Sequence, residues 1–401
     1  MIEKGLYAIK PKKFKNIEFL GSHGTYWEAT DYRLSQLLTQ NVLYSAYHSP
    51  KTITEIATLL GVKPNLIEEE VHYLESNGFM DVVSISNRQK KYLTNMLIHD
   101  FSKEVCEERH SIFSKYAEII CERYMPLVIS FKLPDTSNDD GEGIYIPEND
   151  KNFFMWSLIT FVCNQKFQNT EQIKKMEKYY TKRKDGGENL ATATTDNNFK
   201  LSFLQEKYFS SGAEVYTIFW KDIQSCSVWI FYSIYDDRKK GFNTTSNEFS
   251  LCYLLKNNKI KKDTIENIVL ENLYRKGFLN YSNNEDGKKI NDIVNFPIIE
   301  MSFESFLDIL PPLKNELLEI ENKLNTEIFS ISKSEYPPHL WEMSQQFYQN
   351  SLSSNELTTR VLERLLLTNT LKPLTEKQKK TVNMMMFVDR GEGRPERHPL
   401  L

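Results

Sequence analysis

The sequence lacks several patterns that would point to a function directly. Its five cysteines are widely spaced: Cys106, Cys121, Cys163, Cys226 and Cys252. This spacing excludes a zinc knuckle and a redox CxxC pair, and it favours a reducing compartment. The longest apolar run, Phe153–Cys163, is shorter than the roughly 20 residues that a bilayer span needs. The stretch Met1–Gly5 has no apolar signal core. We therefore expect a cytoplasmic location and no membrane partner.

Signatures of catalysis are absent as well. None of the seven histidines forms an HExxH pair or another paired metal spacing, and the chain has neither a Walker A loop nor a Gly-x-Ser-x-Gly elbow. We therefore expect no enzyme, no cofactor and no metal. Charge is nearly balanced, with 50 Lys and Arg against 54 Asp and Glu. This balance excludes the strong basic excess of a nonspecific nucleic-acid binder, so any DNA contact has to come from a local patch.

Local helix signals are strong in the first hundred residues. Thr52-Ile53-Thr54-Glu55 matches a capping box, in which the Thr and Glu side chains each satisfy a backbone donor of the other, and it predicts a helix through Leu60. Gly61 ends that helix, because glycine tolerates the left-handed conformation of a tight turn. Pro64 suits the first position of the next helix, which we expect to end near Ser76.

Further elements surround these two helices. An earlier helix is predicted to begin near Thr30, with apolar residues at helical spacing, and to end at Ser49-Pro50. Two extended runs, Phe79–Ile85 and Lys91–Ile98, are joined by a polar stretch and predict a hairpin. A longer helix, about Phe101–Tyr124, follows. The predicted order is helix, helix, tight turn, helix and a two-stranded wing.

This order resembles the winged helix-turn-helix of bacterial transcription regulators. The resemblance covers about residues 30–98 and rests on Thr52–Leu60, Gly61, Pro64–Ser76, Gly78-Phe79 and the wing. In that family the second helix of the motif enters the DNA major groove while the wing contacts the backbone. The resemblance implies that four residues on or beside the helix face DNA: Lys63, Asn65, His72 and Tyr73. It also implies three basic phosphate contacts in the wing: Arg88, Lys90 and Lys91.

The helix that would read DNA is acidic. It carries Glu68, Glu69, Glu70 and Glu75, and carboxylates repel phosphates. Two interpretations therefore stay open. The first is a transcriptional regulator that binds DNA through its N-terminal winged helix as a dimer, with a central sensing or docking domain. The second is a protein–protein adaptor in a transcription or signalling assembly, whose winged helix does not contact DNA. A basic patch around the wing would favour the first, and an exposed apolar patch beside the acidic helix would favour the second.

A second resemblance concerns the opening of the chain. The stretch Gly21–Thr30, leading into Leu34–Leu38 and followed by a winged helix and a long α+β tail, looks like the regulatory region found downstream of sigma-type domains in some bacterial transcription factors. Only about 20 residues precede it here, so no sigma domain is expected. Such a region would bind protein rather than DNA, which would explain an acidic motif helix.

The middle of the chain predicts an antiparallel sheet with helices. Residues 180–195 read as a hairpin around Lys184–Gly187, and Glu214–Trp220 and Cys226–Ile234 are rich in aromatic and branched residues. The many aromatic residues here fit either a ligand pocket or an ordinary sheet–helix core, and the second interpretation is favoured. A small-molecule ligand stays unidentified.

A stretch in the second half resembles one in the first. Leu74–Met80 pairs with Leu273–Leu279, and in both a helix precedes a Gly-aromatic pair. A hairpin follows in each case, and then a long helix, Ser302–Phe329 in the later copy, interrupted at Pro311-Pro312. Either the chain contains a second winged-helix-like unit, or this is a coincidental helix–glycine–strand junction.

The predicted fold class is α+β. We expect an N-terminal winged helix-turn-helix with an arm and linker helix (1–124) and a central α+β domain with an antiparallel sheet (125–245). A second winged-helix-like unit (246–330) and a helical C-terminal region with a mobile tail (331–401) follow. The expected partners are a protein or a second copy of the chain, with DNA as the alternative.

Overall fold

The structure, a computed structural model, divides into two compact units that each combine three stretches of chain. It describes residues 11–22, 32–86, 89–131, 143–164, 175–183, 186–196, 213–220, 223–231, 246–283, 289–310, 314–350, 354–382 and 384–389. Unit 1 comprises Met1–Ile112, Gln168–Leu201 and Glu321–Leu352, and unit 2 comprises Phe113–Phe167, Ser202–Ile320 and Ser353–Leu401. Helices and sheets are mixed, in agreement with the predicted α+β class. The four-way division of the chain stays a prediction.

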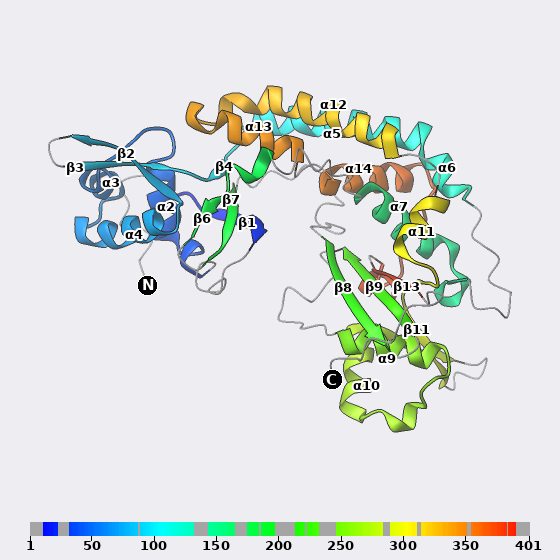
Figure 1. Ribbon diagram of the computed structural model, residues 1–401. Helices are drawn as coiled ribbons and strands as arrows, with labels where there is room; N and C mark the ends of the chain where they lie inside the picture. Colours follow the sequence, from blue (N-terminus) through cyan, green and yellow to red (C-terminus); the bar gives the residue numbers. More distant parts are fainter. Residues whose placement is uncertain are drawn as a thin grey trace. The chain divides into compact units, whose positions relative to one another are not determined.

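Unit 1 contains helices, a hairpin and a small sheet (Figure 1). Its elements are β1 (Phe14–Ser22), α2 (Leu37–Ser45), α3 (Ile53–Leu60), α4 (Pro64–Ser76), β2 (Met80–Ser86), β3 (Gln89–Thr94), β4 (Leu97–His99), β6 (Thr181–Lys182), β7 (Glu188–Thr195) and α13 (Trp341–Asn350). The boundary between the units falls inside two long helices, α5 (Lys103–Arg123) and α12 (Lys314–Ser332).

Unit 2 contains a larger sheet and more helices. Its elements are α6 (Met125–Ile129), β5 (Ile144–Tyr145), α7 (Lys151–Asn164), β8 (Ala213–Trp220), β9 (Ile223–Phe231), α9 (Ser246–Lys256), the 3-10 turn η3 (Lys262–Thr264), α10 (Asn267–Lys276), β10 (Leu279–Asn283), β11 (Lys289–Val294), β12 (Ile298–Ile299), α11 (Phe303–Ile309), α14 (Ser354–Leu367), the 3-10 turn η6 (Gln378–Lys380) and β13 (Met384–Asp389). No helix in the described parts of either unit is long and apolar enough to span a bilayer.

The local helix signals are confirmed. The Glu55 backbone N–H donates to Thr52 Oγ1 at 3.2 Å, and the Thr52 N–H donates to Glu55 Oε2 at 2.7 Å, which completes the capping box of α3. Gly61 follows with a φ of 68°, in the left-handed region. Pro64 occupies the first turn of α4, which ends at Ser76 as predicted.

Two segments differ from the sequence-based expectations. The predicted strand Lys91–Ile98 is two strands, because β3 ends at Thr94 and β4 pairs in parallel with β7 in another sheet. The predicted first helix is interrupted, because residues 32–34 are helical but α2 begins only at Leu37, after a break at Ser35 and Gln36; the predicted start near Thr30 falls outside the described residues. The apolar run Phe153–Cys163 lies within α7, a helix buried on almost every side. Residues 390–401, at the end of the predicted C-terminal region, fall outside the described residues.

Each unit has a sheet in which a short strand pairs in parallel with a strand from much later in the chain. In unit 1 the order is β1-β7-β4, with β6 also on β7, and Leu97 faces Thr192 across the β4–β7 pair. In unit 2 the order is β5-β12-β13-β9-β8, and Ile298 faces Met386 across the β12–β13 pair.

Two modules share one order of elements. The N-terminal module (residues 37–99) runs α2, α3, α4, the β2–β3 hairpin and β4. The second module (residues 246–299) runs α9, η3, α10, the β10–β11 hairpin and β12. The third helix of each ends at a glycine with positive φ, 73° at Gly78 and 77° at Gly277.

Backbone hydrogen bonds repeat at the same places in both modules. The N–H of the aromatic residue after each glycine donates at 2.9 Å, from Phe79 to the Leu74 carbonyl and from Phe278 to the Leu273 carbonyl. The N–H of Asn95 then donates to Phe79 at 2.8 Å, and that of Asn295 donates to Phe278 at 2.9 Å. The likeness therefore extends from the helix end through the hairpin to the short parallel strand.

Candidate functional site

The exposed face of α4 and the β2–β3 hairpin is where the sequence places a binding site. Lys63, at the start of α4, and Asn65 and His72 on the helix are exposed. Tyr73 is half-buried. In the hairpin, Lys90 is exposed and Lys91 is half-buried, whereas Arg88 lies outside the described residues. The structure thus leaves three of the helix residues open to a ligand.

One of the four carboxylates on α4 is an interior group. Glu70 is only 6% exposed. Its carboxylate lies 2.7 Å from an Arg33 guanidinium nitrogen and accepts a 2.8 Å hydrogen bond from the Thr39 hydroxyl. The Arg33 guanidinium also stacks 5.2 Å from the centre of the Tyr73 ring. Because Arg33 covers one face of that ring, Tyr73 is part of the packing between α4 and the segment that precedes α2.

The hairpin and α4 compensate each other's charge. Lys90 Nζ lies 3.1 Å from Glu75 Oε1, and the hydrogen bond and charge of Glu75 raise the pKa of the lysine. Hydrogen bonds from Thr52 lower the pKa of Glu55, and the charge of Lys91 acts in the same direction. Glu68 and Glu69 remain exposed on α4. The hairpin lysines therefore face carboxylates of their own module.

Aliphatic side chains are exposed on the same two elements. Leu66, in the first turn of α4, is 45% exposed, and Val83 and Ile85 on β2 are 46% and 69% exposed. Ile85 pairs in register with Lys90, so the two side chains project from the same face of the hairpin. Since Lys90 contacts Glu75, that face adjoins the acidic helix. The sequence shows that these residues are apolar, but it does not show that they are exposed.

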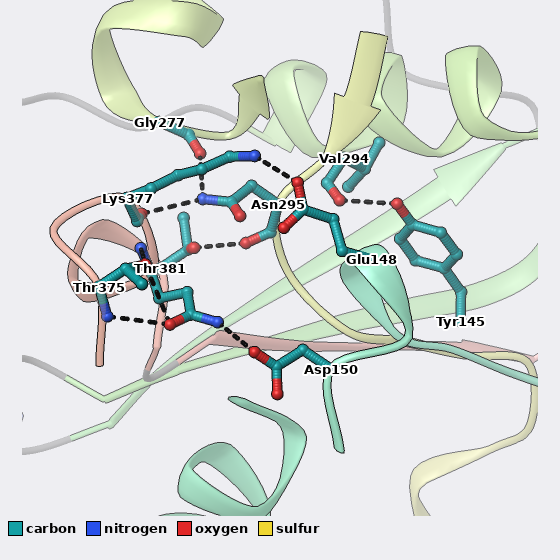
Figure 2. A network of polar contacts seen from close by, with 10 residues as sticks. Tyr145, Glu148, Asp150, Gly277, Val294, Asn295, Thr375, Lys377 and Thr381 are labelled. Carbon is teal, nitrogen blue, oxygen red and sulfur yellow. Dashed lines mark hydrogen bonds and ion pairs between the residues drawn. The ribbon is translucent and has the colours of Figure 1, made fainter. Parts of the chain in front are cut away.

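A polar network closes the second module at the corresponding place (Figure 2). The Asn295 side-chain amide donates to the Gly277 carbonyl at 3.1 Å and to the Lys377 carbonyl at 3.2 Å. The Thr381 hydroxyl donates to the Asn295 carbonyl. At the N-terminal module, Thr181 on β6 makes the contact that corresponds to the Asn295–Gly277 hydrogen bond. Its hydroxyl donates to the Gly78 carbonyl at 3.4 Å. Asn295 is buried, so this network stabilises the fold and is not a binding site.

The same network fixes the chain that enters β13. The Gln378 amide donates to Asp150 Oδ2 at 2.6 Å, and Gln378 Oε1 accepts from the Thr375 backbone N–H at 3.0 Å. Lys377 Nζ lies 2.7 Å from Glu148 Oε1, and the two side chains meet at the edge of the network (Figure 2). These contacts hold η6 against the segment that precedes α7.

Unit 1 contains a partly buried chain of polar side chains. His99 Nδ1 and the Tyr336 hydroxyl are 2.5 Å apart, the Tyr336 and Tyr348 hydroxyls are 2.9 Å apart, and Arg109 donates to Tyr348 at 3.0 Å. Burial lowers the pKa of His99 to about 3, and the charge of Arg109 acts in the same direction. His99 is half-buried among the rings of Phe101, Tyr336 and Phe347, and with this pKa it is neutral at neutral pH.

The acidic residue after the short parallel strand is paired in both units. Asp100 accepts from Lys12 at 2.7 Å, from Tyr44 at 2.5 Å and from Thr195 at 2.7 Å. Burial alone would raise the pKa of Asp100, but these hydrogen bonds outweigh it and hold the pKa below its usual value. In unit 2, Glu300 follows β12 and lies 2.9 Å from Lys256 Nζ.

Within the residues that the structure describes, no three His, Cys, Asp or Glu side chains are grouped closely enough to hold a metal ion. Comparisons of the chain with family models, with curated proteins and with solved structures each find no match. The case for a function therefore rests on the surface of α4 and the hairpin.

Proposed function

We propose that the N-terminal module is a winged helix that binds a partner protein in a transcription or signalling assembly, and that α4 does not read DNA. One observation carries the proposal. Exposed aliphatic side chains lie on the acidic helix and the hairpin, while the hairpin lysine that would anchor a phosphate is paired with Glu75. Exposed apolar groups rimmed by charge are typical of protein interfaces.

DNA binding by α4 would work against this charge distribution. A phosphate backbone contributes most of the affinity of DNA-binding modules through Lys and Arg contacts. Here a phosphate approaching α4 would meet Glu68 and Glu69, and it would have to displace Glu75 from Lys90. Transcriptional regulation through DNA binding by α4 remains the second candidate, because Lys63, Asn65 and His72 are exposed on that helix.

The partner surface is testable with a pair of positions of equal exposure. Ile85 on β2 and Leu367 at the end of α14 are both 69% exposed. A photo-crosslinking amino acid is placed at each position in turn, in the full chain, within the cells that naturally make the protein. It should give a discrete crosslinked partner from position 85 and none from position 367. The captured protein, once identified and purified, should bind the Ile85→Asp variant at least tenfold more weakly and the Leu367→Asp variant with unchanged affinity.

A DNA experiment separates the two candidates. Replacing Lys63, Lys90 and Lys91 together with Ala should leave the affinity for duplex DNA unchanged if α4 contacts protein. If α4 and the hairpin bind DNA, the same variant should lose affinity for all sequences alike, and the salt dependence should flatten by about one unit per lost contact. The second result would overturn the proposal.

A further inference from the structure

The β2–β3 hairpin of the N-terminal module has one closed edge and one open edge. On the outer edge of β3, the Tyr92 N–H donates to the Lys51 carbonyl at 2.8 Å and the Lys51 N–H donates to the Tyr92 carbonyl at 3.0 Å. The Thr94 N–H donates to the Ala46 carbonyl at 3.1 Å on the same side. Among the described residues, β2 pairs with β3 and with no other strand. The edge of β2 that faces away from β3 is therefore open.

The pairing register shows which backbone groups point to this open edge. Tyr92 uses both of its backbone groups on Lys51, so it forms a non-hydrogen-bonded pair with Val82, the residue opposite it on β2. Hydrogen-bonded and non-hydrogen-bonded pairs alternate along β3, so Lys90 and Ile85 form the next non-hydrogen-bonded pair. The N–H and C=O groups of Val82 and Ile85 consequently point away from β3, and no described segment bonds to them.

A β-bulge at Val83 keeps these outward groups at the spacing of a strand. Val82 and Ile85 are three residues apart on β2, yet the residues opposite them on β3 are only two apart. The bulge absorbs the extra residue, so the outward groups follow the two-residue repeat of a regular strand. A further strand can therefore pair with both positions at once.

We propose that the partner protein binds the N-terminal module by adding an extended segment to the open edge of β2. The inference rests on the proposed function and names the form in which the partner binds. Backbone donors and acceptors at strand spacing match another strand, whereas a helix uses its own backbone groups internally and DNA has no alternating donors and acceptors at this spacing. The added segment is apolar, because Val83 and Ile85 are exposed and β-branched or aromatic neighbours pack best beside them.

The corresponding hairpin of the second module lacks this apolar edge. When the helix-ending glycines of the two modules are matched, Ser282 and Asn284 take the positions of Val83 and Ile85. Because the two modules share their backbone hydrogen bonds at the hairpin, the fold alone does not require aliphatic residues on this edge. Their exposure in the N-terminal module is therefore consistent with a binding surface.

Short random peptides displayed on phage and selected against the full chain provide the probe. The strongest binder is synthesised, and its affinity is measured by fluorescence anisotropy. Val82→Pro removes one N–H of the open edge and spares the ladder with β3, because proline is tolerated on an edge strand where its N–H would face solvent. This variant should bind the peptide about tenfold more weakly, because a peptide carbonyl loses its donor. Val82→Thr, which keeps the N–H and the branched side chain, should bind with unchanged affinity.

Methylation of the peptide backbone gives a readout that does not depend on the folding of a variant. A methyl group on a backbone nitrogen removes one donor, and the N–H groups of a strand face its neighbour only at every second residue. Methylation at alternate residues should therefore abolish binding, while methylation at the residues between them leaves it unchanged. Equal losses at consecutive residues would overturn the inference.

Three other results would also overturn the inference. The first is a selection that yields no peptide. The second is weaker binding by Ile85→Asp without any effect of Val82→Pro, which leaves the proposed function standing, because the side chains and not the backbone edge would then hold the partner. The third is a dimer of the full chain that Val82→Pro dissociates, because a second copy would then occupy the edge. Failure of the crosslink from position 85 would instead overturn the proposed function.

Discussion

The Lys90 ammonium lies 3.1 Å from the Glu75 carboxylate, so the hairpin and the acidic helix of the N-terminal module neutralise each other at this point. The contact is solvent-exposed, and such pairs contribute little to stability because water screens them. Its importance is for binding, since it decides whether Lys90 is available to a phosphate.

Replacing Glu75 with Gln tests that availability. Under the proposed function the affinity for random duplex DNA should stay unchanged. If the hairpin contacts DNA, the variant should bind DNA more tightly than the unmodified chain, because the substitution removes one repulsive charge and releases one lysine. Glu104→Gln, at an exposed position near the start of α5, removes the same charge without releasing a partner of the hairpin. Equal gains from both substitutions would show that net charge, and not the Glu75–Lys90 contact, controls the affinity.

The Thr52 cap should contribute measurably to the stability of unit 1. Thr52→Ala removes the side-chain acceptor of the Glu55 N–H and is expected to lower the free energy of unfolding by about 1 kcal/mol. Urea denaturation followed by circular dichroism measures the loss. Thr54→Ala, two residues later on the exposed side of α3, should cost almost nothing.

The two helix-ending glycines should differ in their tolerance of a side chain. Both adopt positive φ, which costs an L-residue roughly 1–2 kcal/mol. A Cβ at Gly78 would lie 1.6 Å from Thr181 Cγ2, whereas at Gly277 it would meet the flexible stem of Lys380. Gly78→Ala should therefore lower the melting temperature more than Gly277→Ala. Adding Thr181→Ser to Gly78→Ala should restore part of the lost melting temperature, because serine lacks the clashing Cγ2. If nothing is restored, the loss comes entirely from the positive φ of the backbone.

The stability of unit 2 should depend on the hydrogen-bonding chemistry of the Asn295 side chain as well as on its size. It is 3% exposed and donates to two carbonyls, so Asn295→Ala is expected to cost about 1–3 kcal/mol. Asn295→Asp should cost more, because a carboxylate cannot donate and would face both carbonyl oxygens. Asn257→Ala, which removes a single bond within the last turn of α9, is the matched control. Equal losses at both positions would contradict the proposed role of the network.

His99 should make unit 1 sensitive to mild acid. Its pKa is about 3 in the fold because of burial and Arg109, against an ordinary value of 6.5, so the unfolded chain binds a proton first as pH falls. The stability from neutral His99 is complete above pH 6.5 and is lost toward pH 3, by at most about 1.4 kcal/mol per pH unit. His48, whose pKa burial also lowers, acts in the same direction.

Urea denaturation between pH 7 and pH 5 should therefore show a smaller slope of stability with pH for His99→Gln than for the unmodified chain. His72→Gln, at an exposed position on α4, is the comparison variant. An unchanged slope in the His99 variant would mean that the imidazole takes up its proton with the same pKa in the folded and unfolded chain.

The sequence predicted the elements whose signals are local. The capping box at Thr52, the left-handed Gly61 and the proline at the start of α4 each depend on neighbouring residues, and all three are confirmed. β4 was misplaced because its partner β7 begins 91 residues after Leu97 (188 − 97), and no local pattern records such a pairing. The apolar run Phe153–Cys163 does not reveal that it forms the helix α7, because a helix buried on almost every side shows no polar face.

The candidate site was predictable as a set of residues but not as an electrostatic surface. The sequence shows four carboxylates on one helix. It does not reveal that Arg33, which precedes the module, forms an ion pair with the buried Glu70, or that Glu75 contacts Lys90. Both contacts join residues that are far apart in the sequence, and they form only because the side chains are long enough and the elements pack together. The exposure of Ile85 depends in the same way on the register of the hairpin.

The position of β13 in its sheet has a consequence for how the chain folds during synthesis. β13 lies between β12 and β9, yet it is made more than 80 residues after the first and more than 150 after the second. Until residues 384–389 have left the ribosome, those two strands have no template on their inner edges, and apolar residues such as Ile298 stay uncovered. A nascent chain arrested just before Met384 would therefore present two open sheet edges, the form in which a protein most readily aggregates or recruits a chaperone.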